Sequence, residues 1–276
     1  MMRKEDRSGN IAAYIILSLG AITMIFPFIW MVSTSLKTYL ETIAYPPKLL
    51  PETFQWGNYK YVFDTSPFLR FYLNSIFVTV AIVIGQLITC SMGAYAFSRL
   101  EFRGRDKIFV GYLATLMIPS QVTLIPTYII VSKLKWIDTY QAMIIPCIFS
   151  AYGTFLLRQF FMTVPKELEE SIRIDGGGAY CCFFHIMIPL TKTVLITLGT
   201  FVFKLAWNNY LWPLLVTNSL DMFTLPLGIK FFVGQFTTYY NYMMAAATMA
   251  MLPTIIIYLF AQKYFTEGIA LSGLKA

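Results

Sequence analysis

The stretch Pro165–Pro189, PKELEESIRIDGGGAYCCFFHIMIP, is a polar interruption between two long apolar runs. Three of its acids, Glu167, Glu169 and Glu170, lie within four positions, and three consecutive glycines follow. Acids are favoured in the first turn of a helix, and glycines let the backbone turn without steric cost. The stretch therefore predicts a short helix, a turn and a second helix lying along a membrane surface. A solvated connecting loop is the simpler alternative.

The chain around this stretch has the composition of a polytopic membrane protein. Hydrophobic residues make up 57% of the 276 residues and charged residues 13%, against about 25% charged residues in ordinary soluble domains. A bilayer core takes about 20 apolar helical residues per crossing. The apolar runs should be helices, because lipid offers the backbone no hydrogen-bond partners and the runs are too long for the strands of about ten residues in a barrel. We therefore predict an all-α fold with six transmembrane helices. The six predicted spans are 11–34, 71–97, 108–131, 141–160, 193–216 and 242–262.

Six crossings bring the chain back to the side on which it started. We predict one transmembrane domain, 1–276, with three segments on that side: an N-terminal segment 1–10, a segment 161–192 and a tail 263–276. The charged N-terminal segment leads directly into a full-length apolar run without a small-residue cleavage site, so a cleaved signal peptide is not expected.

The distribution of basic residues gives the orientation. The formal net charge is +7, and the segments on the side of the termini carry thirteen Lys and Arg residues against seven in the other loops. The densest cluster is the loop RLEFRGRDK, 99–107. Because cytoplasmic loops are enriched in Lys and Arg, both termini and the segment 161–192 are predicted to be cytoplasmic. The basic balance follows from this orientation, and we predict no nucleic-acid partner.

Polar and proline residues inside the spans indicate a bundle with an interior. Pro119, Pro126 and Pro146 free backbone carbonyls at membrane depth, where neighbouring helices or a water-filled cavity must satisfy them. For Gln86 in the second span, an interhelical hydrogen bond is favoured over a substrate contact. Gln121, beside Pro119, is a candidate for the substrate pathway.

The fifth span contains Lys204, Trp207, Asn208 and Tyr210. A lysine in a span usually faces a cavity or a partner, although its long side chain also reaches the interface. Amide groups beside aromatic faces suit a neutral polyhydroxylated ligand, whereas the same residues also suit an aromatic belt with interhelical asparagine bonds. Both interpretations stay open, and these four residues are candidates for the substrate pathway. The aromatic-rich loop 35–70 is likewise either an interfacial anchor or part of a docking surface for an outer partner.

Several kinds of chemistry are missing from the sequence. It has no G-x-x-x-x-G-K-[ST] nucleotide motif, and its single histidine, His185, excludes a multi-histidine metal site. The four cysteines show no metal-ligand spacing, and the spans carry no paired carboxylates for a proton relay. We therefore predict neither an enzyme nor a bound cofactor, and energy for transport must come from another protein.

The opening stretch resembles a known signature. Glu170-Ser171-Ile172, three residues, Gly176, nine residues and Ile186-Met187-Ile188-Pro189 match the Glu-Ala-Ala, three, Gly, nine, Ile-x-Leu-Pro pattern in the membrane subunits of bacterial ATP-binding-cassette importers. The chain has Ser171, Ile172 and Ile188 where the pattern has Ala, Ala and Leu. Other stretches resemble the maltose-type carbohydrate branch: Ser35-Leu36-Lys37, Trp207-Asn208, Leu211-Trp212-Pro213-Leu214, Thr224-Leu225-Pro226, Ala245–Ala247 and Gln262-Lys263-Tyr264-Phe265.

This resemblance implies a type I importer permease fold in the bacterial plasma membrane. It implies a heterodimer with a second permease subunit, two cytoplasmic ATPase subunits that bind ATP and Mg²⁺, and an extracytoplasmic sugar-binding protein. Glu170 then acts as a charged contact with the ATPase and Gly176 as the turn that allows close approach. Glu169, Arg173 and Asp175 complete the candidate coupling surface. Lys204 has no counterpart in the pattern. An importer of a non-sugar solute and an ion-coupled carrier are the alternatives.

Overall fold

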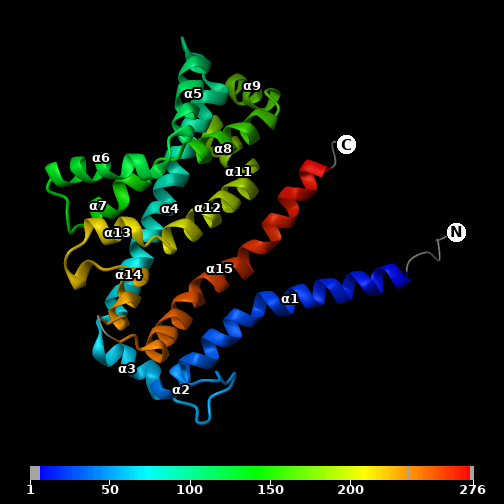
Figure 1. The fold of residues 1–276 in the computed structure, drawn as a ribbon. Coiled ribbons are helices and arrows are strands. Elements are labelled where there is room, and N and C mark those ends of the chain that lie inside the picture. Colours follow the sequence, from blue (N-terminus) through cyan, green and yellow to red (C-terminus); the bar gives the residue numbers. More distant parts are fainter. Residues whose placement is uncertain (1–6, 235–236, 274–276) are drawn as a thin grey trace. The chain divides into compact units, whose positions relative to one another are not determined.

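The computed structural model describes residues 7–234 and 237–273, and within them helices dominate (Figure 1). Among the described residues, the only extended pairing is an isolated bridge between Val233 and Thr238. Three helices are long and apolar enough to cross a membrane, and three bent helix pairs raise the number to as many as six. The long helices are α1 (Arg7–Ser35), α4 (Phe68–Arg99) and α15 (Tyr240–Gly273). The predicted all-α fold is confirmed, and the predicted number of six spans is the upper number that these helices allow.

The chain divides into two compact units. The first comprises Met1–Phe68 with Ile229–Met251, and the second comprises Leu69–Gly228 with Leu252–Ala276. The first unit holds α1, α2 (Tyr39–Ile43), α3 (Gly57–Thr65), η5 (Lys230–Phe232) and the beginning of α15.

A buried polar cluster organises the first unit where α1 ends. The Asn58 Nδ2 group donates to the carbonyl oxygens of Ser35, at 2.8 Å, and Lys37, at 2.9 Å. Lys37 is 2% exposed, and its ammonium group lies 4.5 Å from the centre of the Trp30 ring and donates to the carbonyl of Lys48. Burial lowers the pKa of Lys37, while the nearby carboxylate of α2 opposes that shift. Lys37, which the resemblance to importers picked out, is therefore a structural residue of this loop.

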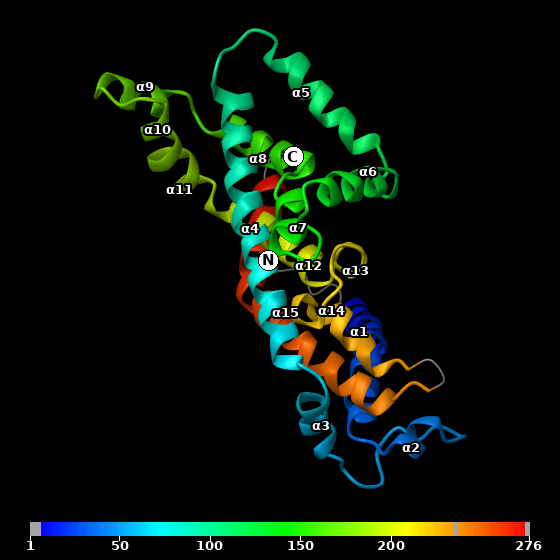
Figure 2. The same cartoon turned by 90° about the vertical axis from the view of Figure 1, so that its left-hand side faces the viewer.

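The second unit holds α4 from Leu69 onward, the end of α15 and, apart from η5, the helices that lie between them in the sequence. These intervening helices are α5 (Arg105–Ala114), η1 (Thr115–Met117), α6 (Ser120–Lys133), α7 (Tyr140–Ile144), η2 (Ile145–Cys147), α8 (Ala151–Thr163), α9 (Glu167–Ile174), α10 (Ala179–Cys182), η3 (Phe183–Met187), α11 (Ile188–Leu190), α12 (Lys192–Trp207), α13 (Leu211–Val216), η4 (Leu220–Met222) and α14 (Leu225–Ile229). In Figure 2, α4 runs between α5 and α6 on one side and α9 to α11 on the other.

Three predicted spans are bent or broken in the structure. The stretch 108–131 forms two helices that meet at 101°, and 141–160 forms two helices that meet at 43°. The first bend lies at Pro119, where Ile118 is extended, as expected for a residue that precedes proline. The stretch 193–216 is interrupted at 208–210, between α12 and α13. Apolar composition alone does not reveal these breaks.

Polar side chains of α4 satisfy the carbonyls that the break between α7 and α8 leaves free. Gln86 donates to the carbonyl of Cys147 at 2.7 Å, and Thr89 donates to that of Ile148 at 2.5 Å. Close approach of the two elements depends on Gly85, where an added Cβ would lie 2.5 Å from the Ile148 side chain. The expected interhelical hydrogen bond of Gln86 is confirmed, and it fixes the bent α7–α8 pair against α4.

Candidate functional site

Helix α9 is the first part of the segment singled out in the sequence. It spans Glu167–Ile174, with three acids in its first turn and Arg173 in its last, as the helix dipole favours. Proline suits the first position of a helix, but α9 begins after Lys166, so Pro165 precedes it. The helix itself is confirmed.

The glycines that follow α9 have separate roles. Gly176 has φ +82°, a left-handed conformation that favours glycine, and a Cβ added there would meet nothing within 4 Å. Gly177 donates its N–H to the carbonyl of Ile172 at 2.8 Å, and a Cβ there would lie 2.3 Å from Ile172 Cγ2. Gly176 therefore forms the turn, whereas the close approach within this chain belongs to Gly177.

The chain continues after the turn as a second helical stretch. It comprises α10, the π-helical turn η3 and α11, so the predicted helix, turn and helix are confirmed. Phe183 and Met187 are buried in the core of the second unit, while His185 is exposed with Nδ1 3.2 Å from the carbonyl oxygen of Cys181. The described residues contain no group of three His, Cys, Asp or Glu side chains suited to a metal ion.

Glu169 points inward. Its side chain is 8% exposed, and Oε1 lies 3.0 Å from Nε of Arg99, the last residue of α4, whose side chain is 4% exposed. The contact is an ion pair without hydrogen-bond alignment. The four-residue spacing of Leu168 and Ile172 predicts that they share the apolar face of the helix, but Leu168 is 40% exposed and the inner face carries Glu169 and Ile172.

The other charged candidates of this segment are exposed. Glu170, Arg173, Asp175 and Gly176 all face away from the core, and the apolar side chain of Ile174 is 86% exposed. Charged and apolar groups thus lie together on the outer surface of α9 and its turn. Such a mixture is typical of a surface that a protein partner covers.

The predicted pathway residues do not form one cluster. Trp207 is 3% exposed, stacked on Phe203 at 5.5 Å between ring centres and edge-on to Tyr72 at 5.9 Å. Asn208 is exposed, and its Nδ2 donates to the Lys204 carbonyl at 2.8 Å, which caps the end of α12. The side chains of Lys204 and Gln121 are exposed, and Tyr210 is half-buried at the break before α13. Gln121 lies at the start of a different helix, α6.

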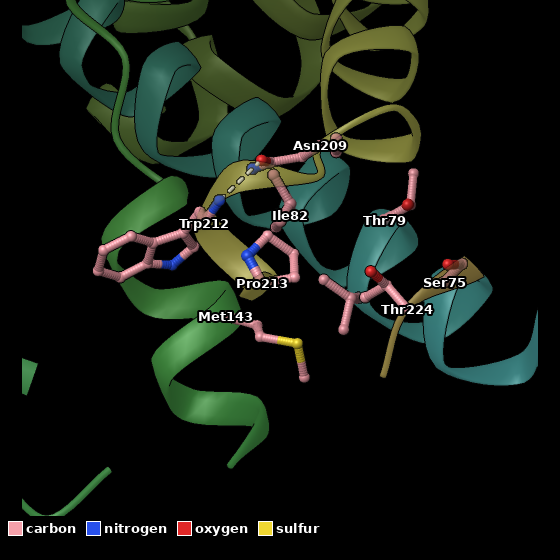
Figure 3. A pocket seen from close by; sticks show the side chains of 10 residues that line it. Ser75, Thr79, Ile82, Met143, Asn209, Trp212, Pro213 and Thr224 are labelled. Carbon is pink, nitrogen blue, oxygen red and sulfur yellow. Dashed lines mark hydrogen bonds between the residues drawn. The ribbon is translucent and has the colours of Figure 1, made fainter. Parts of the chain in front are cut away.

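A small cavity lies where α12 breaks (Figure 3). Ser75 and Thr79 of α4, Thr224, Asn209 and Trp212 contribute to its lining, and Asn209 Oδ1 accepts a hydrogen bond from the Trp212 backbone N–H at 3.3 Å. Its volume of about 10 Å³ compares with the 10–15 Å³ that holds one water, so it is not a solute site. The sequence singled out Asn208, but the structure places its neighbour Asn209 inward. The asparagine pair itself carried no signal for which one lies inside.

The loop between α13 and α14 is held by side chains of other elements. Asn74 Nδ2 donates to the carbonyl oxygens of Asp221, at 2.7 Å, and Phe223, at 2.9 Å. The Asp138 carboxylate accepts the backbone N–H groups of Asn218, at 2.8 Å, and Ser219, at 3.0 Å. Burial of Asp138 works to raise its pKa, but these donors prevail and lower it.

The fold and the exposed surface of α9 indicate the class of protein to which the chain belongs. The chain is a helical protein with up to six segments that could cross a membrane, and the outer surface of α9 is exposed. A family model described as "Binding-protein-dependent transport system inner membrane component" matches residues 87–270. The chain belongs to this family, and it is therefore a transport permease of the bacterial inner membrane.

Individual relatives extend the similarity over almost the whole chain. The sn-glycerol-3-phosphate transport system permease protein UgpE of Pectobacterium atrosepticum is 35% identical over 275 residues, 96% of this chain and 98% of the relative. The arabinooligosaccharides transport system permease protein AraQ of Halalkalibacterium halodurans is 33% identical over 258 residues, 92% of each chain. A chain in the crystal structure of a bacterial ABC transporter involved in import of the acidic polysaccharide alginate matches with a TM-score of 0.85 and 25% identity, covering 96% of this chain and 99% of that one.

Proposed function

We propose that this chain is one of two permease subunits of an ATP-driven carbohydrate importer and that its 165–189 segment docks on a cytoplasmic ATPase. One observation carries the proposal: α9 turns Glu169 inward and leaves Glu170, Arg173 and the apolar Ile174 on its outer surface. An exposed helix with charged and apolar groups at the start of a glycine turn suits insertion into a cleft of a partner.

ATP hydrolysis belongs to the partner subunits in this proposal. The chain has no glycine-rich loop ending in Lys and Ser or Thr that would hold nucleotide phosphates. The two ATPases bind ATP and Mg²⁺, close on each other and displace α9, and the permease then changes between inward-open and outward-open states. Glu170 and Arg173 supply charged contacts to the ATPase, Asp175 ends the helix and Gly176 provides the turn.

Orientation and outer partners follow the charge distribution. We place both termini and α9 in the cytoplasm because thirteen basic residues lie on that side against seven on the other. The loop after α1 and the loop between α13 and α14 are then extracytoplasmic. A solute-binding protein, on which the family depends by its description, delivers solute to that side, and a second permease subunit completes the pathway.

The solute is proposed to be a polyhydroxylated molecule. AraQ is named for arabinooligosaccharides and the structural relative for alginate, and both are carbohydrates. Gln121, Asn208 and Tyr210 lie at exposed or half-buried positions, and we assign them to the pathway. Trp207 supports the pathway from within the core through its stacking with Phe203.

A phosphorylated polyol is the second candidate solute. UgpE is named for sn-glycerol 3-phosphate, and the exposed side chain of Lys204 offers a cation near the break after α12. An ammonium group attracts a phosphate as a point charge. If the solute is a phosphorylated polyol, Lys204 selects it by its negative charge; for a neutral carbohydrate, we assign Lys204 no role.

Reconstitution of the complex tests the proposal. The chain is expressed with its neighbouring permease, ATPase and binding-protein genes, and the complex is placed in liposomes with ATP inside. Uptake of radiolabelled arabinooligosaccharide and of sn-glycerol 3-phosphate is then measured, with Lys204→Gln as the variant. ATP-dependent uptake of the sugar that Lys204→Gln leaves intact supports the carbohydrate proposal. Uptake of the phosphate ester that falls at least tenfold in Lys204→Gln supports the second candidate. Uptake without ATP contradicts both.

A further inference from the structure

Glu169 is the one fully buried residue of α9, beside the half-buried Ile172. Its neighbours Glu167, Leu168, Glu170 and Ser171 are all exposed. A buried carboxylate is costly unless a charged partner faces it, so the position of Glu169 needs a reason beyond solubility.

Arg99 supplies that partner and joins three elements. It is the last residue of α4, its Nε lies 3.0 Å from Glu169 Oε1, and its terminal nitrogen donates to the carbonyl oxygens of Phe161 and Val164 at the end of α8. The guanidinium thus holds the end of α4, the end of α8 and the first turn of α9 together. Guanidinium suits this task because its donors are fixed in one plane.

Helix α9 has further connections to the second unit, because Ile172 packs against the core of that unit. The segment 164–166 links α8 to α9, and the turn with Gly176 and Gly177 follows α9. The nearby ion pair of Arg158 with Asp106 spans 3.7 Å and joins α8 to α5 instead, with an Asp106 side chain that is 71% exposed. Exposed pairs of that kind contribute little.

We propose that the Arg99–Glu169 pair is the link that makes α4 and α9 move as one body, so that displacement of α9 by a docked ATPase reaches the membrane-spanning helix α4. The inference rests on the proposed function, because it assumes that an ATPase moves α9. It assigns separate tasks to adjacent acids: Glu170 contacts the partner, and Glu169 is a positioning residue that passes the movement inward. Replacement of Glu170 should then weaken contact with the ATPase, whereas replacement of Glu169 should weaken the transmission of movement to α4.

Distance measurement in the assembled complex tests the link. Spin labels are placed at Ser171 on α9 and at Met92, a 57% exposed residue of α4, in a variant whose native cysteines are substituted. Label distances are recorded without nucleotide and with ATP, Mg²⁺ and orthovanadate, which traps the closed ATPases. The variants are Glu169→Gln, Glu169→Ala and the matched control Glu167→Gln, which removes an exposed acid of the same helix. Copurification of the ATPases is measured in each.

The proposal predicts one narrow distance in both states for the native pair and for Glu167→Gln. Glu169→Gln, which keeps the shape but loses the charge, should shift and broaden the distance on trapping while the ATPases still copurify, and Glu169→Ala should do so more strongly. If the Glu169→Ala chain does not assemble into the complex, the label distances in Glu169→Gln alone test the link. A distance in Glu169→Gln that matches the native one in both states overturns the link, as does a native distance that changes on trapping. Failure of the ATPases to copurify with the native chain instead overturns the proposed function.

Discussion

Replacement of Gly177 by alanine should loosen α9, whereas the same replacement at Gly178 should not. A Cβ at Gly177 would lie 2.3 Å from Ile172 Cγ2 and 3.1 Å from the Ile172 carbonyl oxygen. Either the Ile172 side chain leaves its place against the core or the turn opens. At Gly178 an added Cβ meets nothing within 4 Å, and φ is −91°, which alanine adopts readily.

The two replacements should differ by about 2 kcal/mol in the free energy of opening this turn. Extra atoms forced into a packed site cost about 1–3 kcal/mol, whereas Gly→Ala at a compatible site gains about 0.4–1 kcal/mol by restricting the unfolded chain. A difference of about 2 kcal/mol corresponds to about a 30-fold change in the opening equilibrium. Gly176→Ala should fall between the two, because a left-handed conformation costs alanine about 1–2 kcal/mol without a clash.

Amide hydrogen exchange of the purified protein in detergent is the assay. The reporter is the Gly177 N–H, which donates to the Ile172 carbonyl at 2.8 Å, together with the Asp175 N–H, which donates to that of Ser171 at 3.1 Å. Peptides covering 167–178 should exchange about 30 times faster in Gly177→Ala than in Gly178→Ala. Equal protection in the two variants would refute the assignment of the close approach to Gly177.

The remaining predictions concern the second unit. Gln86→Leu removes the donor to the half-buried carbonyl of Cys147 and should cost about 1–3 kcal/mol, which lowers the thermal unfolding midpoint. Thr127→Val, whose hydroxyl donates within its own helix, is the control, and equal midpoints would contradict the prediction. Trp212→Phe removes the 2.9 Å hydrogen bond to the Ala142 carbonyl and should cost a similar amount, and an unchanged midpoint speaks against it. The pKa of Asp138 is lowered on folding, so its stabilisation is complete above about pH 4 and is lost as pH falls through the lowered value. Asp138→Asn should flatten the dependence of the midpoint on pH between about 5 and 3, and an undiminished slope would show that another group carries it.

Much of the fold was predictable because composition and length decide which segments can cross lipid. The long apolar runs predicted α1, α4 and α15, and the glycines after Asp175 predicted the turn. The breaks were not predictable, because Pro119 is compatible with a kinked continuous helix as well as with the observed 101° bend. The bend between α7 and α8 is stabilised by Gln86 and Thr89 of α4, which donate to the carbonyls of Cys147 and Ile148. These donors lie about sixty residues earlier in the sequence.

The candidate site was predictable in kind but not in the task of each residue. Three acids within four positions indicate an acidic first turn, which the structure has. Periodicity, however, favoured Leu168 as the inner residue, whereas Glu169 is the buried one. The deciding residue, Arg99, lies seventy positions earlier at the end of another helix. Similarly, Trp207 was a candidate ligand contact because it is an aromatic residue beside amide side chains, but it packs in the core against Phe203 and Tyr72.

Site-specific crosslinking tests the central claim that α9 docks on a cytoplasmic ATPase. A photoreactive amino acid is introduced at Ile174, 86% exposed beside the turn, and at Leu205, 74% exposed on α12 within a predicted span. The complex is irradiated in native membranes, and crosslinked products are identified by mass spectrometry. The account predicts an ATPase crosslink at Ile174 that is lost in Glu170→Ala, with none at Leu205. A crosslinking pattern in which Leu205 captures the ATPase and Ile174 does not would contradict it.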